Sequence, residues 1–136
     1  MKGLVQNGGR WIALGAGFGF LGVALGAFGA HWLKARLSPE DLAIFEVGVR
    51  YQMYHALALL LIGGVRGSVA PGLARCSGAM FTVGIVVFSG SLYGLVLAQA
   101  RWLGVITPMG GIAFLAGWLL LLVSATRPRP AFERST

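Results

Sequence analysis

Four long apolar stretches, almost free of charged side chains, constrain this sequence more than any other feature. They cover about residues 11–31, 48–66, 78–100 and 103–125. A helix of about 20 residues crosses the roughly 30 Å hydrocarbon core of a bilayer. The second stretch is uncharged only from Tyr51 to Val65, and it reaches this length when it is extended backward through Val47 and Val49. We therefore predict an all-α fold, a four-helix transmembrane bundle.

The composition argues against a soluble enzyme and against a nucleic-acid partner. Charged residues make up 11% of the 136 residues, and the mean hydropathy is +0.78, whereas soluble domains carry roughly 25% charged residues. The net charge is +7, but the basic residues are scattered singly and form no recognition motif. The single cysteine, Cys76, excludes an internal disulfide and a multi-cysteine zinc site. We predict no catalytic residues, no cofactor and no metal.

The basic residues also predict the orientation, because cytoplasmic segments hold the excess of Lys and Arg. With four spans, one side carries Lys2, Arg10, Arg66, Arg75, Arg127, Arg129 and Arg134. The other side carries Lys34, Arg36, Arg50 and Arg101. We predict a multi-pass protein of the bacterial inner (plasma) membrane with both termini in the cytoplasm. Residues 1–126 would form one membrane domain, and residues 127–136 a basic cytoplasmic tail that contains proline.

The first loop carries the sequence signals of a helix start. Ser38 is a good capping residue, Pro39 suits the first helical position, and Glu40 and Asp41 follow in the first turn. Apolar residues then recur at helical spacing, at Leu42, Phe45 and Val49. We expect a short amphipathic helix in this first extracytoplasmic loop.

Glycines predict how the helices pack. Each glycine weakens a helix by about 1 kcal/mol relative to alanine, so 22 of them need a structural reason. In the first stretch five recur at alternating spacings of four and three residues, which places them on one helix face. Small residues let helix backbones approach closely in lipid. The predicted packing positions are Gly15, Gly19, Gly22, Gly26, Gly29, Gly90, Gly94, Gly110, Gly111 and Gly117.

Polar residues inside the predicted spans form the candidate site, because burying polar groups in hydrocarbon is costly. With the predicted orientation they fall in the outer half of the bilayer. This candidate polar cluster comprises His31, Tyr51, Gln52, His55, Ser89, Ser91, Tyr93 and Thr107. The two histidines could approach each other and bind a metal, a proton or haem. The alternative is that each histidine hydrogen-bonds a neighbouring helix or loop.

Pro108 allows two interpretations. Proline followed by Gly110 and Gly111 could break a helix at a transport site. A proline in the first turn is equally typical of a helix start, which we favour. The tryptophans Trp11, Trp32, Trp102 and Trp118 are expected mostly near the membrane interfaces.

Several separate motifs, in order, resemble one family. They are Ala24-Leu25-Gly26-Ala27-Phe28-Gly29-Ala30-His31, Tyr51-Gln52 with His55, Phe88-Ser89-Gly90-Ser91-Leu92-Tyr93, Thr107-Pro108 with Gly110-Gly111, and Gly117-Trp118. Over about residues 11–124 the chain is similar to the YgdD-like family of small bacterial inner-membrane proteins. This group is the domain of unknown function 423, related to the transmembrane protein 256 family. The resemblance implies a four-helix integral membrane protein and implies no reaction, substrate or cofactor.

Two functions follow as expectations. The first is a non-enzymatic structural or accessory membrane protein that works through helix and lipid contacts, as a homo-oligomer or as a subunit of a larger complex. The second is a protein that handles a small solute, protons or a metal through the polar cluster. A wide pore inside one four-helix bundle is not expected, because side chains fill its interior.

Overall fold

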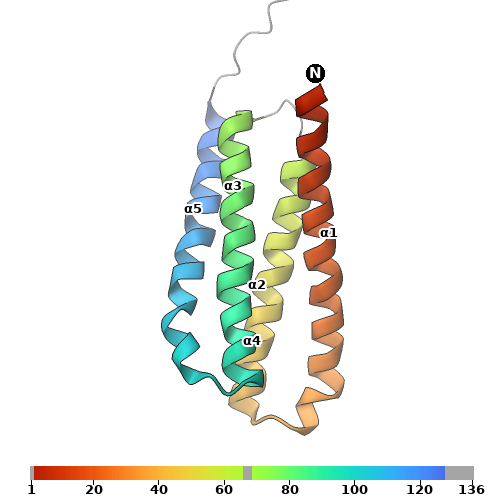
Figure 1. Ribbon diagram of the computed structural model, residues 1–136, viewed down its shortest axis with the longest axis vertical. Helices are drawn as coiled ribbons and strands as arrows, with labels where there is room; N and C mark the ends of the chain where they lie inside the picture. The colour runs from red at the N-terminus through yellow and green to blue at the C-terminus, as the bar shows by residue number, and fades with distance from the viewer. Residues whose placement is uncertain (1, 66–68, 128–136) are drawn as a thin grey trace, which may run out of the picture.

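The computed structural model describes residues 2–65 and 69–127 and forms four long helical rods (Figure 1). The first rod is α1 (Lys2–His31) and the second is α2 (Pro39–Gly64). The third consists of α3 (Pro71–Gly84), a π-helical turn η2 (Ile85–Ser89) and α4 (Gly90–Leu97). The fourth is α5 (Thr107–Thr126). Two short 3-10 helices, η1 (Leu33–Ala35) and η3 (Arg101–Val105), lie in the connections. The predicted all-α, four-helix fold is confirmed.

The start of α1 and the end of α5 lie at the same end of the bundle, the terminal end (Figure 1). The connections over residues 32–38 and 98–106 lie at the opposite end, the loop end. Among the described residues, three segments are long and apolar enough to cross a membrane, namely Gly8–Ala35, Pro71–Leu97 and Arg101–Thr126. Because α1 ends at the loop end and α3 begins at the terminal end, α2 must return across the same thickness.

The structure differs from the sequence prediction in the first loop. Ser38 caps the helix as expected, because its Oγ accepts a hydrogen bond of 3.1 Å from the backbone N–H of Asp41. However, the expected amphipathic helix is not a separate element. Nothing breaks the backbone ladder before residue 51, so this segment forms the first turns of α2. Its apolar face is buried inside the bundle, where Phe45 is fully covered.

Several boundaries also differ from the predicted stretches. The third rod starts at Pro71 and ends at Leu97, because proline provides a helix start earlier than the uncharged stretch suggests. Pro108 lies in the first turn of α5, which confirms the helix-start interpretation. The predicted end of the second stretch at Arg66 and the tail beyond Arg127 lie outside the described residues.

The helix α1 packs against α2 through glycines. A Cβ atom added at Gly15 would lie 2.7 Å from the carbonyl oxygen of Ala56, and one at Gly22 would lie 2.6 Å from the sulfur of Met53. A Cβ atom at Gly29 would lie 3.0 Å from the ring of Phe45, whereas one at Gly26 would lie 3.4 Å from Val49, close to an ordinary contact. Gly19 faces open space, because its spacing places it at the edge of this contact. Four of the five predicted positions therefore form the α1–α2 interface.

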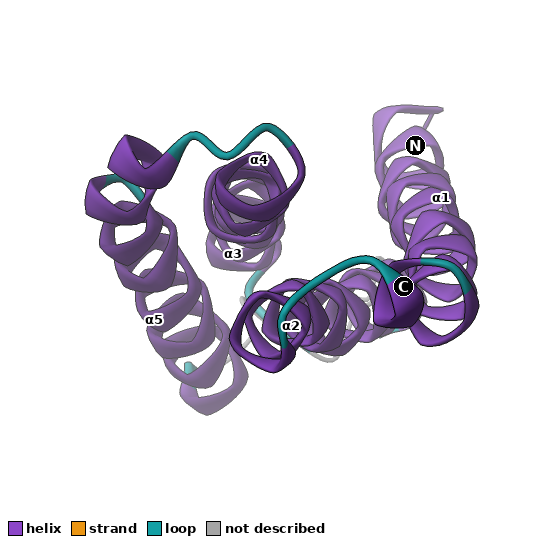
Figure 2. Cartoon of the chain, turned by 90° about the horizontal axis from the view of Figure 1, so that it is seen from below, coloured by secondary structure: helices purple, strands orange, loops and turns teal. Residues whose placement is uncertain are grey.

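Glycines also bring α5 against the third rod. Gly110 touches the backbone of Phe88, and Gly117 lies under the ring of Phe81. Gly94 lies against Leu103 of η3. Gly111 makes only ordinary contacts of 3.9 Å, and Gly90 faces open space, so neither permits a close approach. Seen from the loop end, α1 lies on one flank of α2, and the third rod and α5 lie on the other (Figure 2).

Two apolar clusters fill the bundle. The larger one comprises Trp11, Ala58, Leu59, Ile62, Phe81, Ile85 and Phe114. The smaller one lies toward the loop end and comprises Leu33, Phe45, Leu95 and Val96. Both include residues of α2, which is therefore the central helix, and its polar residues Gln52 and His55 are buried.

Candidate functional site

His55 of α2 uses both of its ring nitrogens inside the protein. Its Nδ1 lies 2.7 Å from the carbonyl oxygen of Tyr51, and its Nε2 lies 3.1 Å from Nε1 of Trp118 on α5. A carbonyl only accepts and an indole N–H only donates, so Nδ1 carries the proton and Nε2 accepts. The imidazole is 4% exposed and stacks on Phe114 with ring centroids 3.5 Å apart. This arrangement leaves no free lone pair for a metal or haem.

Gln52 joins three rods. Its Nε2 donates to the backbone oxygen of Phe18 on α1 at 2.8 Å. Its Oε1 accepts from the hydroxyl of Tyr93 on α4 at 2.8 Å. Tyr93 fits there because Gly48, one turn earlier on α2, has no side chain to displace the phenol ring. The amide side chain therefore fixes α2 against both of its flanks.

Three hydroxyl side chains tie the loop-end half of the third rod to its neighbours. Ser89, in the π-helical turn, donates to the carbonyl oxygen of Gly48 at 2.7 Å and is fully buried. Ser91 shares a hydrogen bond of 2.7 Å with Thr107 at the start of α5. These bonds satisfy polar groups that would otherwise face hydrocarbon.

The structure separates His31 from the rest of the predicted cluster. His31 is exposed at the last residue of α1. The neighbouring Gly29 lies level with Phe45, and His55 is ten residues farther along α2, about 15 Å at 1.5 Å per residue. The proposed histidine pair is therefore absent. A second helix that starts at residue 48, as the apolar stretch predicts, would place His55 closer to the loop end than α2 does, because α2 starts at Pro39.

The depth prediction holds for only part of the cluster. Ser91 and Thr107 lie toward the loop end, but Gln52 and His55 lie near the middle of α2 because this helix starts at Pro39. Tyr51 is 40% exposed, and its ring packs on Phe88 with centroids 4.8 Å apart. The polar contacts thus extend from the loop end to the centre of the bundle.

Sequence reasoning missed two residues that complete these contacts. Trp118 is not near an interface: it lies midway along α5, and its indole N–H donates a hydrogen bond to His55. Its position near the middle of the fourth apolar stretch could have indicated such a hydrogen bond, because an indole N–H at that depth needs an acceptor. The sequence patterns use Arg101 of η3 to predict the orientation but give it no side-chain partner.

Arg101 clamps the loop end. Its two terminal nitrogens donate to both carboxylate oxygens of Asp41 at 2.8 and 3.0 Å. The guanidinium holds the pKa of the Asp41 carboxyl below its ordinary value of 3.8. The pair joins the first turn of α2 to the connection before α5. The Arg101 side chain is 56% exposed and that of Asp41 is 13% exposed, so solvent at the guanidinium screens the pair and its contribution to stability is small.

Comparison with known proteins identifies the family. Residues 25–111 match the family model described as "Protein of unknown function (DUF423)". A UPF0382 membrane protein of Staphylococcus haemolyticus is 46% identical over 114 residues, covering 84% of this chain and 93% of the relative. A UPF0382 membrane protein of Bacillus subtilis is 42% identical over 118 residues, covering 86% of this chain and 96% of the relative. The chain belongs to this family.

Membership agrees with the resemblance seen in the sequence motifs, and the protein is a small bacterial membrane protein with several candidate spans. No solved structure matches the chain. The family descriptions assign no reaction, so the chemistry of the described side chains must carry the functional argument.

Proposed function

We propose that this protein is a structural or accessory membrane protein, without catalytic activity, that works through contacts with lipid and with a second copy of itself. One observation supports this most strongly. In the described part of the chain, every buried polar side-chain atom already has a hydrogen-bond partner. The interior therefore offers no unpaired donor or acceptor to a substrate.

The alternative, a solute-, proton- or metal-handling protein, draws less support from these contacts. Both ring nitrogens of His55 already form hydrogen bonds, to Tyr51 and to Trp118. The side-chain amide of Gln52 forms hydrogen bonds to Phe18 and Tyr93. A transport site would have to break these bonds before it could bind anything.

The outward face of α1 is the surface we assign to self-association. Helical spacing places Ala13, Gly17, Phe20 and Ala24 on one face, opposite the glycines that meet α2. All four are exposed, and Phe20 is 75% exposed. By contrast, the exposed face of α5 consists of large aliphatic side chains such as Leu115. The outward face of α1 also exposes Leu21 and Phe28, but its small residues let a second helix approach closely, whereas a face of large aliphatic residues suits lipid.

Disulfide cross-linking in the native membrane tests this assignment. In a Cys76→Ser background, Ala24→Cys should form a cross-linked dimer on oxidation. The matched control is Leu115→Cys, because Leu115 lies on the exposed face of α5 and is 71% exposed. The proposal fails if both variants cross-link equally or if Ala24→Cys stays monomeric. If Ala24→Cys forms a cross-link to a different protein, the proposed self-association is wrong and this face instead contacts a partner subunit.

Gly17→Leu provides a second test, because a side chain at Gly17 meets no atom of its own chain within 4 Å. This change should weaken the dimer and leave the fold of each copy intact. Gly22 and Gly26 face Met53 and Val49 of α2, so leucine at either position would report folding instead of self-association.

We also propose that the terminal end faces the cytoplasm. The support is the distribution of basic residues, which favours that side under the positive-inside rule. Both ends of the described chain then lie on the cytoplasmic side.

A further inference from the structure

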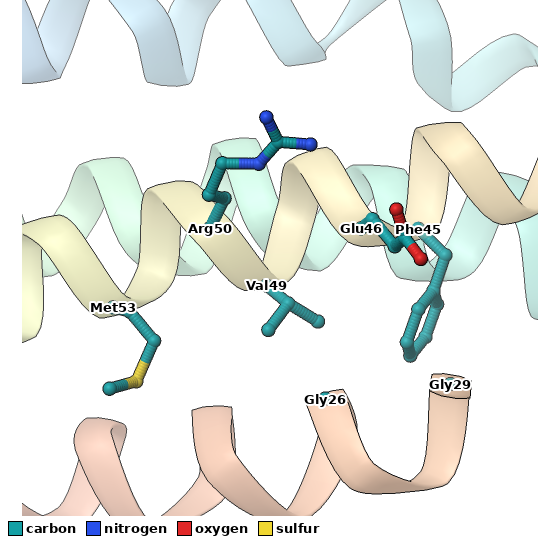
Figure 3. Close-up of a pocket in the computed structure, with 7 residues that line it drawn as sticks. All are labelled: Gly26, Gly29, Phe45, Glu46, Val49, Arg50 and Met53. Carbon is teal, nitrogen blue, oxygen red and sulfur yellow. The ribbon is translucent and has the colours of Figure 1, made fainter. Parts of the chain in front are cut away.

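A groove of about 310 Å³ lies along the seam between α1 and α2. Gly26 and Gly29 form its α1 side, where the absence of side chains leaves the space open. Phe45, Val49 and Met53 line it from α2 and point toward α1 (Figure 3). The groove is apolar along its length, and its volume is at the low end for ligand sites. It could hold part of an elongated apolar molecule, such as one acyl chain.

The groove lies at the depth of one lipid leaflet. Gly29 is two residues from the end of α1 at the loop end. From Phe45 to Met53 the groove follows α2 for eight residues, about 12 Å at 1.5 Å per residue. The hydrocarbon of one leaflet is about 15 Å thick, half of a 30 Å core. The groove therefore lies within the leaflet at the loop end, where it can contact a lipid headgroup and the first part of one acyl chain.

Two opposite charges lie at the rim of this groove. Glu46 and Arg50 are one helical turn apart on α2, and both side chains are exposed. The guanidinium of Arg50 points away from α1, so its stem borders the groove while its charge lies outside (Figure 3). Within the described residues the structure records one ion pair, Arg101 with Asp41, so neither rim charge is paired in this way. Charges at membrane depth are costly without a partner.

We propose that this groove binds a phospholipid whose headgroup carries both a phosphate and a primary ammonium. Arg50 donates hydrogen bonds to the phosphate oxygens, since guanidinium groups match phosphate well. Glu46 accepts from the ammonium group. One acyl chain lies along Val49 and Met53. An anionic lipid without an ammonium would leave Glu46 facing a like charge, and a choline headgroup would offer it no hydrogen-bond donor.

This inference is independent of the proposed self-association. The groove opens on the α1–α2 seam, whereas Ala13, Gly17 and Ala24 lie on the opposite face of α1. A failure of one proposal therefore leaves the other standing. A second copy seated in the groove is the competing occupant, but the outward face of α1 carries no charge that would pair with both Glu46 and Arg50.

Native mass spectrometry of the purified full chain tests the proposal. The protein is exchanged into detergent that contains equal amounts of dioleoyl phosphatidylethanolamine, phosphatidylglycerol and phosphatidylcholine. We expect one phosphatidylethanolamine to be retained about tenfold more than either competitor, as a charge-assisted contact would give. Equal retention of the three lipids, or a dimer that retains none, overturns the proposal.

Charge variants separate this site from general lipid coating. Arg50→Gln should lower retention of all phospholipids. Glu46→Gln should remove the preference for the ammonium headgroup and raise retention of phosphatidylglycerol. Glu40→Gln is the matched control, because Glu40 is exposed on the same helix outside the groove. The proposal is also overturned if the control changes the lipid preference as much as Glu46→Gln does.

Discussion

At the scale of single residues, the buried polar side chains of the described residues hydrogen-bond to neighbouring helices. The sequence could identify which ones matter, because Gln52, His55, Ser89 and Tyr93 stand out in apolar stretches. It could not predict the pairs. Each pair depends on the depth and rotation of two helices. The predicted start of the second helix, residue 48, differs from the observed start at Pro39. This difference places His55 beside Trp118 and far from His31.

The bond between His55 and Trp118 gives a residue-scale prediction. Trp118→Phe keeps an aromatic ring but leaves the buried Nε2 of His55 without a donor. The free energy of unfolding should fall by about 1 kcal/mol, the usual size of such a bond in a membrane protein. Thermal unfolding in detergent measures this. Trp102→Phe is the control, because Trp102 is 66% exposed. Equal effects of the two changes would contradict the assigned hydrogen bond.

At the scale of elements, α2 determines the arrangement of the other helices. It lies between α1 and the third rod (Figure 2). Its Gln52 hydrogen-bonds to both of these neighbours, which shield this side chain from lipid. The glycine spacing of three and four in α1 was sufficient to predict a packing face. It did not show that Gly19 lies at the edge of that face. The glycines repeat every 3.5 residues but the helix turns every 3.6, so they do not all point in the same direction.

Two neighbouring glycines of α1 give an element-scale prediction. Gly15→Ala should lower the free energy of unfolding by about 1–3 kcal/mol, because its Cβ would meet the carbonyl of Ala56 at 2.7 Å. Gly17→Ala should leave it unchanged or raise it by up to about 1 kcal/mol, because no atom lies within 4 Å and alanine favours the helix. Thermal unfolding followed by circular dichroism compares the two. Shifts of the same sign and size would show that α1 does not pack through Gly15.

At the scale of the whole molecule, the described residues form a four-helix bundle with a packed interior, and the functional surfaces that we propose lie on its outside. Hydropathy alone predicted the number of helices, because uncharged stretches of this length have few other uses. It could not predict that the amphipathic segment after Pro39 continues into α2, since this depends on Phe45 finding a buried position beside Leu33 and Val96. We propose that α2 returns through the membrane, which brings the start of α1 and the end of α5 to the same side.

Site-directed thiol labelling tests this claim most directly. In a Cys76→Ser background, single cysteines are introduced by Ser38→Cys and Ala98→Cys at the loop end and by Gly9→Cys and Thr126→Cys at the terminal end. A membrane-impermeant maleimide applied to intact cells should label positions 38 and 98, and should label positions 9 and 126 only after the membrane is permeabilised. Labelling of positions 9 and 126 from opposite sides of the membrane would contradict the four-crossing bundle.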